Sequence, residues 1–313
     1  MARSGFRRVG DHSQTAATVR FIPMSRRGVL LFAAMCVIWG IPYLMIRVAV
    51  RELAPVTLVF FRTALAAVLL LPFAIWRKEL RALLPHWRAL LLYTGIEVAL
   101  PWFLLAKAEI HLSSSLTGLL IAAVPLVGAV IAGLTGERER QGTRRWLGLL
   151  VGIAGVAAIV GLDVGQVHVV PLLLIACVAV CYAIGPIIFA RSLSGAPPLS
   201  VVVASLLLTA IVYAPLAAFR WPASMPSAHV VESVIGLAVV CTALGFILFF
   251  ALIRELGPVR ATVITYVNPA VAAIVGVAFL NEKITTGMIV GFALVIAGSI
   301  LATGRGPEPV PEP

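Results

Sequence analysis

Apolar residues run in long blocks along this chain, separated by short polar segments rich in Arg, Gly and Pro. A helix needs about 20 apolar residues to cross the hydrocarbon core of a bilayer. Reading the chain with a window of that length predicts ten membrane-spanning helices. They cover residues 28–50, 55–76, 88–106, 112–134, 145–161, 170–190, 198–219, 231–253, 261–280 and 285–302. The pattern therefore predicts an all-α polytopic membrane protein with almost no room for a soluble domain.

Prolines and glycines recur at the same spacing in the two halves of the chain, with an offset of 143 or 144 residues. The matching pairs are Pro55/Pro198, Pro72/Pro215, Pro125/Pro269, Gly148/Gly291 and Gly155/Gly298. The third and eighth spans show no such match. Because each copy holds five spans, an odd number, the second copy enters the bilayer from the opposite side. We therefore predict two inverted five-helix repeats, residues 28–161 and 170–302, around a central cavity.

Composition supports the membrane class, and the distribution of charge adds an orientation. The chain has 313 residues, is 61% hydrophobic and 12% charged, and carries a formal net charge of +11. The basic residues lie mainly in an N-terminal tail (1–27) and in the second and fourth connections, and a Pro-rich tail (303–313) ends the chain. The basic residues of the N-terminal tail and of these two connections are Arg3, Arg7, Arg8, Arg20, Arg26, Arg27, Arg77, Lys78, Arg81, Arg88, Arg138, Arg140, Arg144 and Arg145. This alternation follows the positive-inside rule, so we expect a multi-pass protein of the cell (plasma or inner) membrane with both termini cytoplasmic and no nucleic-acid partner.

The residues that membrane-embedded catalysis requires are scarce. Asp11 and Asp163 are the only aspartates, and both lie outside the predicted spans. None of the five histidines lies in the middle of a predicted span. Acidic clusters that would hold Mg²⁺ on a phosphate are therefore missing, and no P-loop pattern occurs. The four cysteines lie in apolar runs without a histidine to complete a metal site. We expect no enzymatic activity, no cofactor and no metal centre.

Two ionisable residues lie inside predicted spans, Arg62 in the second and Glu97 in the third. A lone charge in hydrocarbon is expensive, so such residues face the bundle interior or a watery cavity. Glu97 can change between neutral and charged forms as its surroundings dry, which a proton-coupling group requires, whereas Arg62 stays charged. Three interpretations are open: a structural ion pair, contacts with a charged substrate, and proton coupling through Glu97.

Aromatic and hydroxyl side chains accompany these charges at helical spacing. Trp39 and Tyr43 share one helix face, as do Tyr93 and Glu97 on another. Cavity wall and interhelical packing are both open for Trp39, and the hydroxyls of the ninth span can also bond their own backbone. We predict a substrate cavity lined by Trp39, Tyr43, Arg62, Tyr93, Glu97, Trp102, Tyr182, Thr262 and Tyr266. The small-residue spacings in the fifth and tenth spans predict close helix packing, with homodimer contacts as an open alternative.

Four segments resemble the EamA family of the drug/metabolite transporter superfamily. They read CVIWGIPY (36–43), APVTLVFFRTALA (54–66), SSSLTGLLIAAVPL (113–126) and NPAVAAIVGVAFLNEKIT (268–285). The resemblance covers residues 28–302 and implies ten helices in two repeats, a central cavity and export of small metabolites. The second copy departs from the first at Ser205, which corresponds to Arg62, and at Ala183, which corresponds to Trp39.

The repeat, the buried charges and the resemblance together predict a secondary active transporter that works by alternating access. Arg62 and Glu97 suit a substrate with both charges, and the tryptophans suit an apolar body. We therefore expect export of a small amphipathic metabolite, an amino acid or a related compound, with protons as the candidate coupling ion. A lipid flippase or scramblase has the same architecture and is the alternative, and a membrane-embedded transferase is the weaker one.

Overall fold

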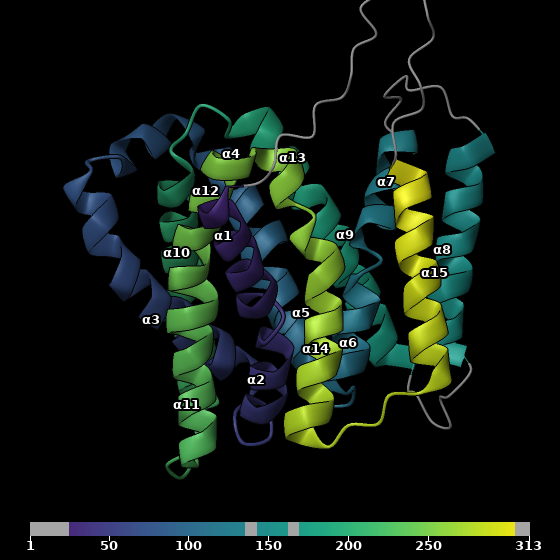
Figure 1. Cartoon of the computed structure of the whole chain (residues 1–313). Coiled ribbons are helices and arrows are strands. Elements are labelled where there is room, and N and C mark those ends of the chain that lie inside the picture. The colour runs from purple at the N-terminus through teal and green to yellow at the C-terminus, as the bar shows by residue number, and fades with distance from the viewer. Residues whose placement is uncertain (1–24, 135–142, 162–168, 304–313) are drawn as a thin grey trace, which may run out of the picture.

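The computed structural model describes residues 25–134, 143–161 and 169–303, and the described residues form a bundle of helices without strands (Figure 1). Nearly all of both expected tails lies outside these ranges. Nine helical runs in the described part are long and apolar enough to cross a membrane. The helix Ile264–Leu280, with 17 residues, is shorter than the other nine. The all-α polytopic fold is thus confirmed, and the count of ten spans stays a prediction.

The described helices follow the predicted spans closely, although several spans consist of more than one element. In chain order they are α1 Arg26–Ile38, α2 Pro42–Ala49, α3 Pro55–Trp76, η1 Leu80–His86, α4 Trp87–Tyr93, η2 Thr94–Ala99, α5 Leu100–Ala108, α6 Ser114–Ile121, α7 Val124–Leu134, α8 Thr143–Gly161, α9 Val169–Ser192, α10 Pro198–Phe219, α11 Ala228–Gly236, η3 Leu237–Leu244, α12 Gly245–Leu256, α13 Pro258–Ala261, α14 Ile264–Leu280 and α15 Thr286–Thr303.

Proline accounts for two of the interruptions. The first span breaks between α1 and α2, where Pro42 begins the second helix, and the fourth breaks just before Pro125. Proline has no N–H to donate to the preceding turn, but its fixed φ suits the first turn of a new helix. At the first of these breaks, Trp39 is the C-cap residue of α1.

Helices α8 and α15 pack with their backbones in contact. A Cβ added to Gly148 would lie 2.7 Å from the carbonyl oxygen of Gly298, and one added to Gly155 would lie 2.7 Å from that of Gly291. Gly148 corresponds to Gly291 in the other copy, and Gly155 corresponds to Gly298. A two-fold rotation that exchanges the copies would therefore turn one of these contacts into the other. The predicted close packing of these spans is therefore present within the chain, and a homodimer stays a prediction.

Helices α3 and α10, which correspond in the two copies, lie antiparallel. The Thr57 hydroxyl near the start of α3 donates to the Arg220 carbonyl at the end of α10, at 3.0 Å. At the other end, the Ser200 hydroxyl of α10 donates to Glu79 just beyond α3, at 2.9 Å. Thr57 and Ser200 are themselves 143 residues apart. Matching helices thus run in opposite directions side by side, as an inverted repeat requires.

The third and eighth spans, which share no sequence match, share a change of backbone. Both contain a π-helical segment, η2 and η3, and the two segments begin 143 residues apart. Each segment has a carbonyl that receives a side-chain donor from a neighbouring helix. Tyr213 donates to the Ala99 carbonyl at 3.0 Å, and the Trp39 indole donates to the Cys241 carbonyl at 3.2 Å. π-Helical turns inside α-helices are frequent at functional sites, so the two segments indicate that the functional site lies in the interior of the bundle.

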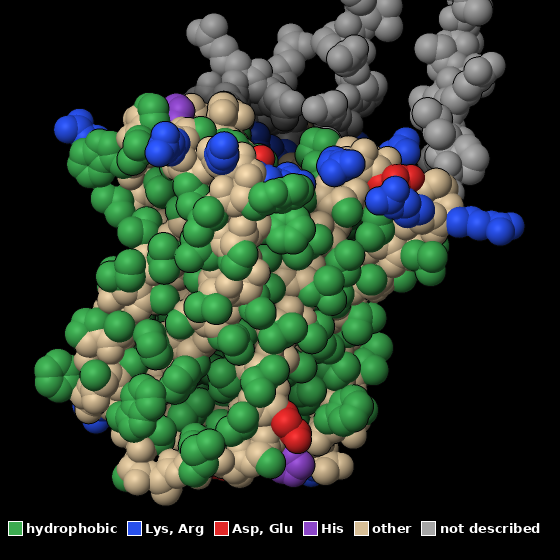
Figure 2. All heavy atoms as spheres, turned by 90° about the vertical axis from the view of Figure 1, so that its left-hand side faces the viewer, with side chains coloured by type: hydrophobic (Ala, Val, Ile, Leu, Met, Phe, Trp, Pro, Cys, Tyr) green, Lys and Arg blue, Asp and Glu red, His purple; other side chains and the backbone are tan. Residues whose placement is uncertain are grey.

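Charge is distributed unevenly between the two ends of the bundle. Figure 1 places the start of α1 and the end of α15 at the same end, here called the upper end, and Figure 2 shows Lys and Arg gathered there above an apolar flank. The described basic residues of the upper end are Arg26, Arg27, Arg77, Lys78, Arg81, Arg88, Arg144, Arg145, Arg191, Arg254 and Arg260. Those of the lower end are Arg47, Arg51, Lys107, Arg220 and Lys283. The chain is thus a multi-pass membrane protein with one strongly basic end.

Candidate functional site

Arg62 lies in the interior of the bundle, on the middle of α3, with only 8% of its surface exposed. Its guanidinium carbon is 3.7 Å from the centre of the Trp102 ring, so the planar group lies against the indole face. The Arg62 Nε atom donates to the Thr242 hydroxyl at 3.1 Å. A guanidinium stacks on aromatic rings in this way and remains charged. Trp102 and Thr242 therefore fix where the charge sits.

The Thr242 hydroxyl is held in an orientation that accepts from Arg62. It donates its own proton to the Leu237 carbonyl at 2.7 Å, a bond that the π-helical register of η3 makes available. The two terminal nitrogens of Arg62 have no acceptor among the described residues. These nitrogens are not among the fully buried unpartnered atoms of the described chain, so they border space that a water molecule or a ligand can reach. A guanidinium that keeps its terminal donors available in this way suits an anionic group.

Glu97 lies in η2 and contacts α9. A Cβ added to Gly185 would lie 1.7 Å from the Glu97 Oε2 atom, so the carboxyl group occupies the space that the glycine leaves open. This Oε2 atom is buried and has no hydrogen-bond partner in the described chain. No ion pair links it with Arg62 among the described residues. The structure therefore does not support the interpretation of Arg62 and Glu97 as a structural ion pair.

Two tyrosines are close enough to these charges to interact with them electrostatically. Tyr182 of α9 is within electrostatic reach of Glu97 and Arg62 and lies beside Trp102. Tyr43 of α2 is within reach of Tyr182 and Arg62. We call the central cluster the set Tyr43, Arg62, Glu97, Trp102, Tyr182 and Thr242. It draws on both copies of the repeat and holds one cation and one carboxyl group that do not neutralise each other.

The other predicted cavity residues lie around this cluster or away from it. The Trp39 indole N–H donates to the Cys241 carbonyl, and the ring packs against Phe249 with ring centres 4.6 Å apart. Trp39 therefore borders the cluster as a packing residue. Tyr93 packs against Phe189 one turn above Glu97. Thr262, the C-cap of α13, and Tyr266, in the first turn of α14, lie at the upper end of the ninth span, and their place in the cavity wall stays a prediction.

Thr242 is the member of the central cluster that the sequence analysis did not single out. A signal for Thr242 lies in the repeat itself. Ser205, the counterpart of Arg62, receives a hydrogen bond of 2.9 Å from Thr94 in η2. In both copies, then, the second helix reaches the π-helical segment of the opposite copy. Both Arg62 and Ser205 make this contact, but only the first copy contributes a charge through it.

A second polar group closes the lower end. The carboxylate of Glu282, just after α14, accepts from the backbone N–H groups of Ser114 and Ser115 at 2.8 Å each. The Ser115 hydroxyl adds a bond of 2.6 Å. Charged acceptors at a helix N-terminus form strong bonds of this kind. We call this contact the lower latch, because it joins α6 of the first copy to α14 of the second.

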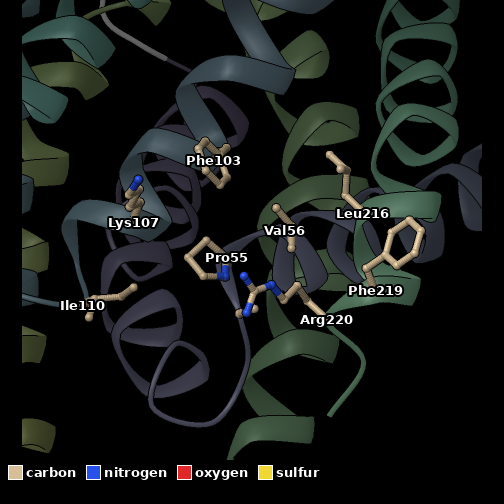
Figure 3. Close-up of a pocket in the computed structure, with 9 residues that line it drawn as sticks. Pro55, Val56, Phe103, Lys107, Ile110, Leu216, Phe219 and Arg220 are labelled. Atoms are coloured by element: carbon tan, nitrogen blue, oxygen red, sulfur yellow. The ribbon is translucent and has the colours of Figure 1, made fainter.

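A pocket of about 400 Å³ opens on the flank at the lower end, outside the central cluster (Figure 3). It lies between the start of α3 and the ends of α5 and α10. Its walls are mostly apolar, with two basic side chains. It is lined by Ala54, Pro55, Val56, Phe103, Lys107, Ile110, Leu216, Phe219 and Arg220. Its composition suits an apolar chain with an anionic end.

The model of the EamA-like transporter family matches residues 26–161 and again residues 170–304. The chain belongs to the EamA-like transporter family. Its relatives include the uncharacterized transporter YvbV of Bacillus subtilis, 24% identical over 89% of this chain and 92% of that protein. The uncharacterized inner membrane transporter YedA of Escherichia coli is 24% identical over 86% of this chain and 88% of its own length. The resemblance predicted from the four motifs is thereby confirmed.

A solved structure has the same fold as this EamA-like transporter. It is titled "Crystal structure of protein", and it superposes with a TM-score of 0.64 over 88% of this chain and 96% of its own. The sequence identity is 19%, so the likeness concerns the fold alone. The printed names of the relatives describe transporters and give no substrate. The assignment as a membrane transporter therefore stands on the family.

Replacing Gly185 with alanine should reduce transport roughly fivefold to a hundredfold, because the added Cβ needs the space of the Glu97 carboxyl group and overpacking of this kind costs roughly 1–3 kcal/mol. Transport and thermal unfolding of the purified variant are the measurements. Gly195→Ala is the matched control, since a Cβ there meets nothing within 4 Å. The double variant Gly185→Ala/Glu97→Ala should regain stability but not transport. Full transport by the single variant would contradict the prediction.

Proposed function

We propose that this EamA-like transporter exports a small amphipathic metabolite, an amino acid or a related compound, by alternating access. The observation that carries the proposal is the buried guanidinium of Arg62, whose terminal donors have no acceptor in the described chain. A charge kept inside a membrane bundle is a functional feature by default. Its position on Trp102, beside the two tyrosines, gives it both polar and apolar surroundings.

Each member of the central cluster has a role in this proposal. Arg62 binds a carboxylate of the substrate through its two free nitrogens, as guanidinium groups do with planar anions. Glu97 binds the ammonium group of the substrate or a proton, in alternation, which makes it the proton-coupling residue. Trp102 and Tyr182 contact the apolar part of the substrate. Family membership supports the transport activity, and the residue chemistry supports the substrate class.

The antiparallel pairing of corresponding helices supports alternating access. Two inverted copies of one asymmetric unit give two shapes of similar energy that open to opposite sides. The lower latch holds the lower end together, so the other shape requires Glu282 to leave Ser114 and Ser115. We assign the basic upper end to the cytoplasm by the positive-inside rule, with both termini there, in the cell membrane.

A lipid flippase or scramblase is the second candidate, and the flank pocket favours it. That pocket combines apolar walls with Lys107 and Arg220 at the lower rim of the bundle, where lipid headgroups lie. An amphipath that enters from the side would use such a pocket first. This alternative predicts movement of lipids rather than release of a water-soluble metabolite.

An export screen separates these functions. Cells that express the protein are loaded with a panel of amino acids and related metabolites, and efflux is measured with and without a proton gradient. We expect faster efflux of at least one member of the panel, lost in Arg62→Ala and Glu97→Gln. Purified protein in vesicles with fluorescent lipids tests the alternative. Lipid movement without any metabolite efflux would overturn the proposal, and product formation in detergent would indicate a transferase.

A further inference from the structure

Glu109 is a buried carboxyl group that does not belong to the central cluster. It follows α5 at the lower end of the bundle and has no exposed surface. Both of its carboxyl oxygens are without a hydrogen-bond partner in the described chain. A buried carboxylate normally accepts several hydrogen bonds, because its desolvation is otherwise very costly. The geometry therefore suits a neutral acid better than an anion.

Arg47, the basic residue beside Glu109, donates its hydrogen bonds to the backbone and not to the Glu109 carboxyl group. Arg47 of α2 donates through one terminal nitrogen to the backbone carbonyls of Glu109 and of Ile110, the latter at 2.8 Å. These carbonyls end α5, where cations are favoured by the helix dipole. No ion pair between the Arg47 guanidinium and the Glu109 carboxyl group occurs among the described residues. Arg47 thus stabilises the backbone and leaves the carboxyl group without a counter-ion in contact.

The remaining ionisable groups around Glu109 come from three further elements and its own loop. They are Tyr43 of α2, Arg62 of α3, Glu282 after α14 and His111 two residues along the chain. Glu282 is already saturated by donors of the lower latch and adds a like charge. Burial raises the pKa of Glu109 well above its usual range, Arg47 opposes this rise, and Glu282 adds to it. These groups agree with the hydrogen-bond geometry.

A line of ionisable side chains leads from Glu109 into the central cluster. Tyr43 is within electrostatic reach of Glu109 on one side and of Tyr182 on the other. Tyr182 is in turn within reach of Glu97. Glu109 and the Glu97 Oε2 atom, which are buried without hydrogen-bond partners in the described chain, are thus each within electrostatic reach of one of these two coupled tyrosines.

We propose that Glu109 is a second proton-binding site of the transporter, which is protonated when the lower latch is closed and supplies protons to Glu97. The proton leaves the Glu109 carboxyl group, Tyr43 and Tyr182 each accept one proton and give one up, and the Glu97 carboxylate becomes neutral. Closing the lower end over an ionised Glu109 is disfavoured, so each closure carries a proton into the protein. The inference rests on the proposed transport function for its purpose, but its test does not.

Protons alone are the probe for the first test. Infrared difference spectra of the reconstituted full chain are recorded as the pH is raised, for the wild type and for Glu109→Gln. We expect the wild type to retain carbonyl absorption of protonated carboxylic acids above the ordinary range of glutamate, and Glu109→Gln to lose the part of it that Glu97→Gln keeps. Glu232→Gln, at an exposed carboxyl of the same end, should keep it. An unchanged band in Glu109→Gln would overturn the proposal.

Thermal unfolding gives a second readout with a defined sign. A carboxyl group with a raised pKa in the folded state stabilises the protein relatively at low pH, and this contribution is lost as the pH rises toward the folded pKa. The unfolding temperature of the wild type should therefore fall with rising pH, and Glu109→Gln should flatten this fall. A variant that fails to fold at neutral pH would indicate an ionised Glu109 and overturn the proposal. Neither readout needs a substrate, so failure of the transport proposal remains distinguishable.

Discussion

Replacing Arg62 with alanine is expected to reduce export roughly tenfold to a hundredfold. The variant loses the charged donors that have no acceptor in the described chain, and hydrogen bonds to charged groups contribute about 1.5–3 kcal/mol each. Arg62→Lys should be impaired as well, because a lysine cannot lie flat on Trp102 and also reach Thr242 with the same geometry. The measurement is efflux from loaded cells or vesicles at matched amounts of folded protein.

Arg51→Ala is the matched control for this prediction, since Arg51 is an exposed arginine in a lower-end connection. Its efflux should stay at the wild-type rate. Arg51→Ala should also unfold at a temperature close to that of the wild type, whereas Arg62→Ala loses the packing of Arg62 on Trp102, so the comparison is made at matched amounts of folded protein. Efflux by Arg62→Ala at the wild-type rate would contradict a substrate-binding role for this residue.

Replacing Gly155 with valine is expected to separate α8 from α15 and to destabilise the fold. A Cβ at Gly155 would meet the backbone of Gly291 at 2.7 Å and the amide nitrogen of Val295 at 2.7 Å. Backbone atoms cannot move aside as flexible side chains do, so the cost is at the upper part of the 1–3 kcal/mol that overpacking causes, or above it. A shift of this size lowers the unfolding temperature on the order of 5–10 °C.

Gly161→Val, near the end of the same helix, is the control, because a Cβ at Gly161 meets nothing within 4 Å. Thermal unfolding of both variants in detergent, followed by fluorescence, is the measurement. Gly291→Val should behave like Gly155→Val, since the two glycines face each other across the helix pair. Equal unfolding temperatures for the Gly155 and Gly161 variants would show that this contact does not support the fold.

For two of the spans, the first and the last helical residue could both be predicted from the sequence. The predicted spans 55–76 and 198–219 are found as α3 and α10 with the same bounds. Both begin at a proline, whose preference for the first helical turn is local, and both end where the apolar run ends. The predicted span 88–106 was too short, because the described helical run begins at Leu80. Its first turns are 3₁₀-helical and less apolar, so an apolar window does not detect them.

The candidate site could be predicted only in part. Arg62 and Glu97 stand out because a charge in an apolar run is visible in the sequence. Their supposed ion pair is absent from the described structure, because one sequence does not fix how each helix is rotated about its axis. The structure has α14 beginning at Ile264, which places Thr262 and Tyr266 at the upper end of the ninth span, and their role in the cavity wall stays a prediction.

The sequence by itself determined the class of the protein, the positions of its spans, the duplication and the family, because apolar length and proline or glycine spacing are local properties. Only the tertiary structure decided which side chains meet. The π-helical register of η2 and η3, the space at Gly185 for Glu97, and the isolation of Glu109 all depend on helices that are far apart in the chain. Packing between the two inverted copies sets these contacts, and no segment of the chain contains them alone.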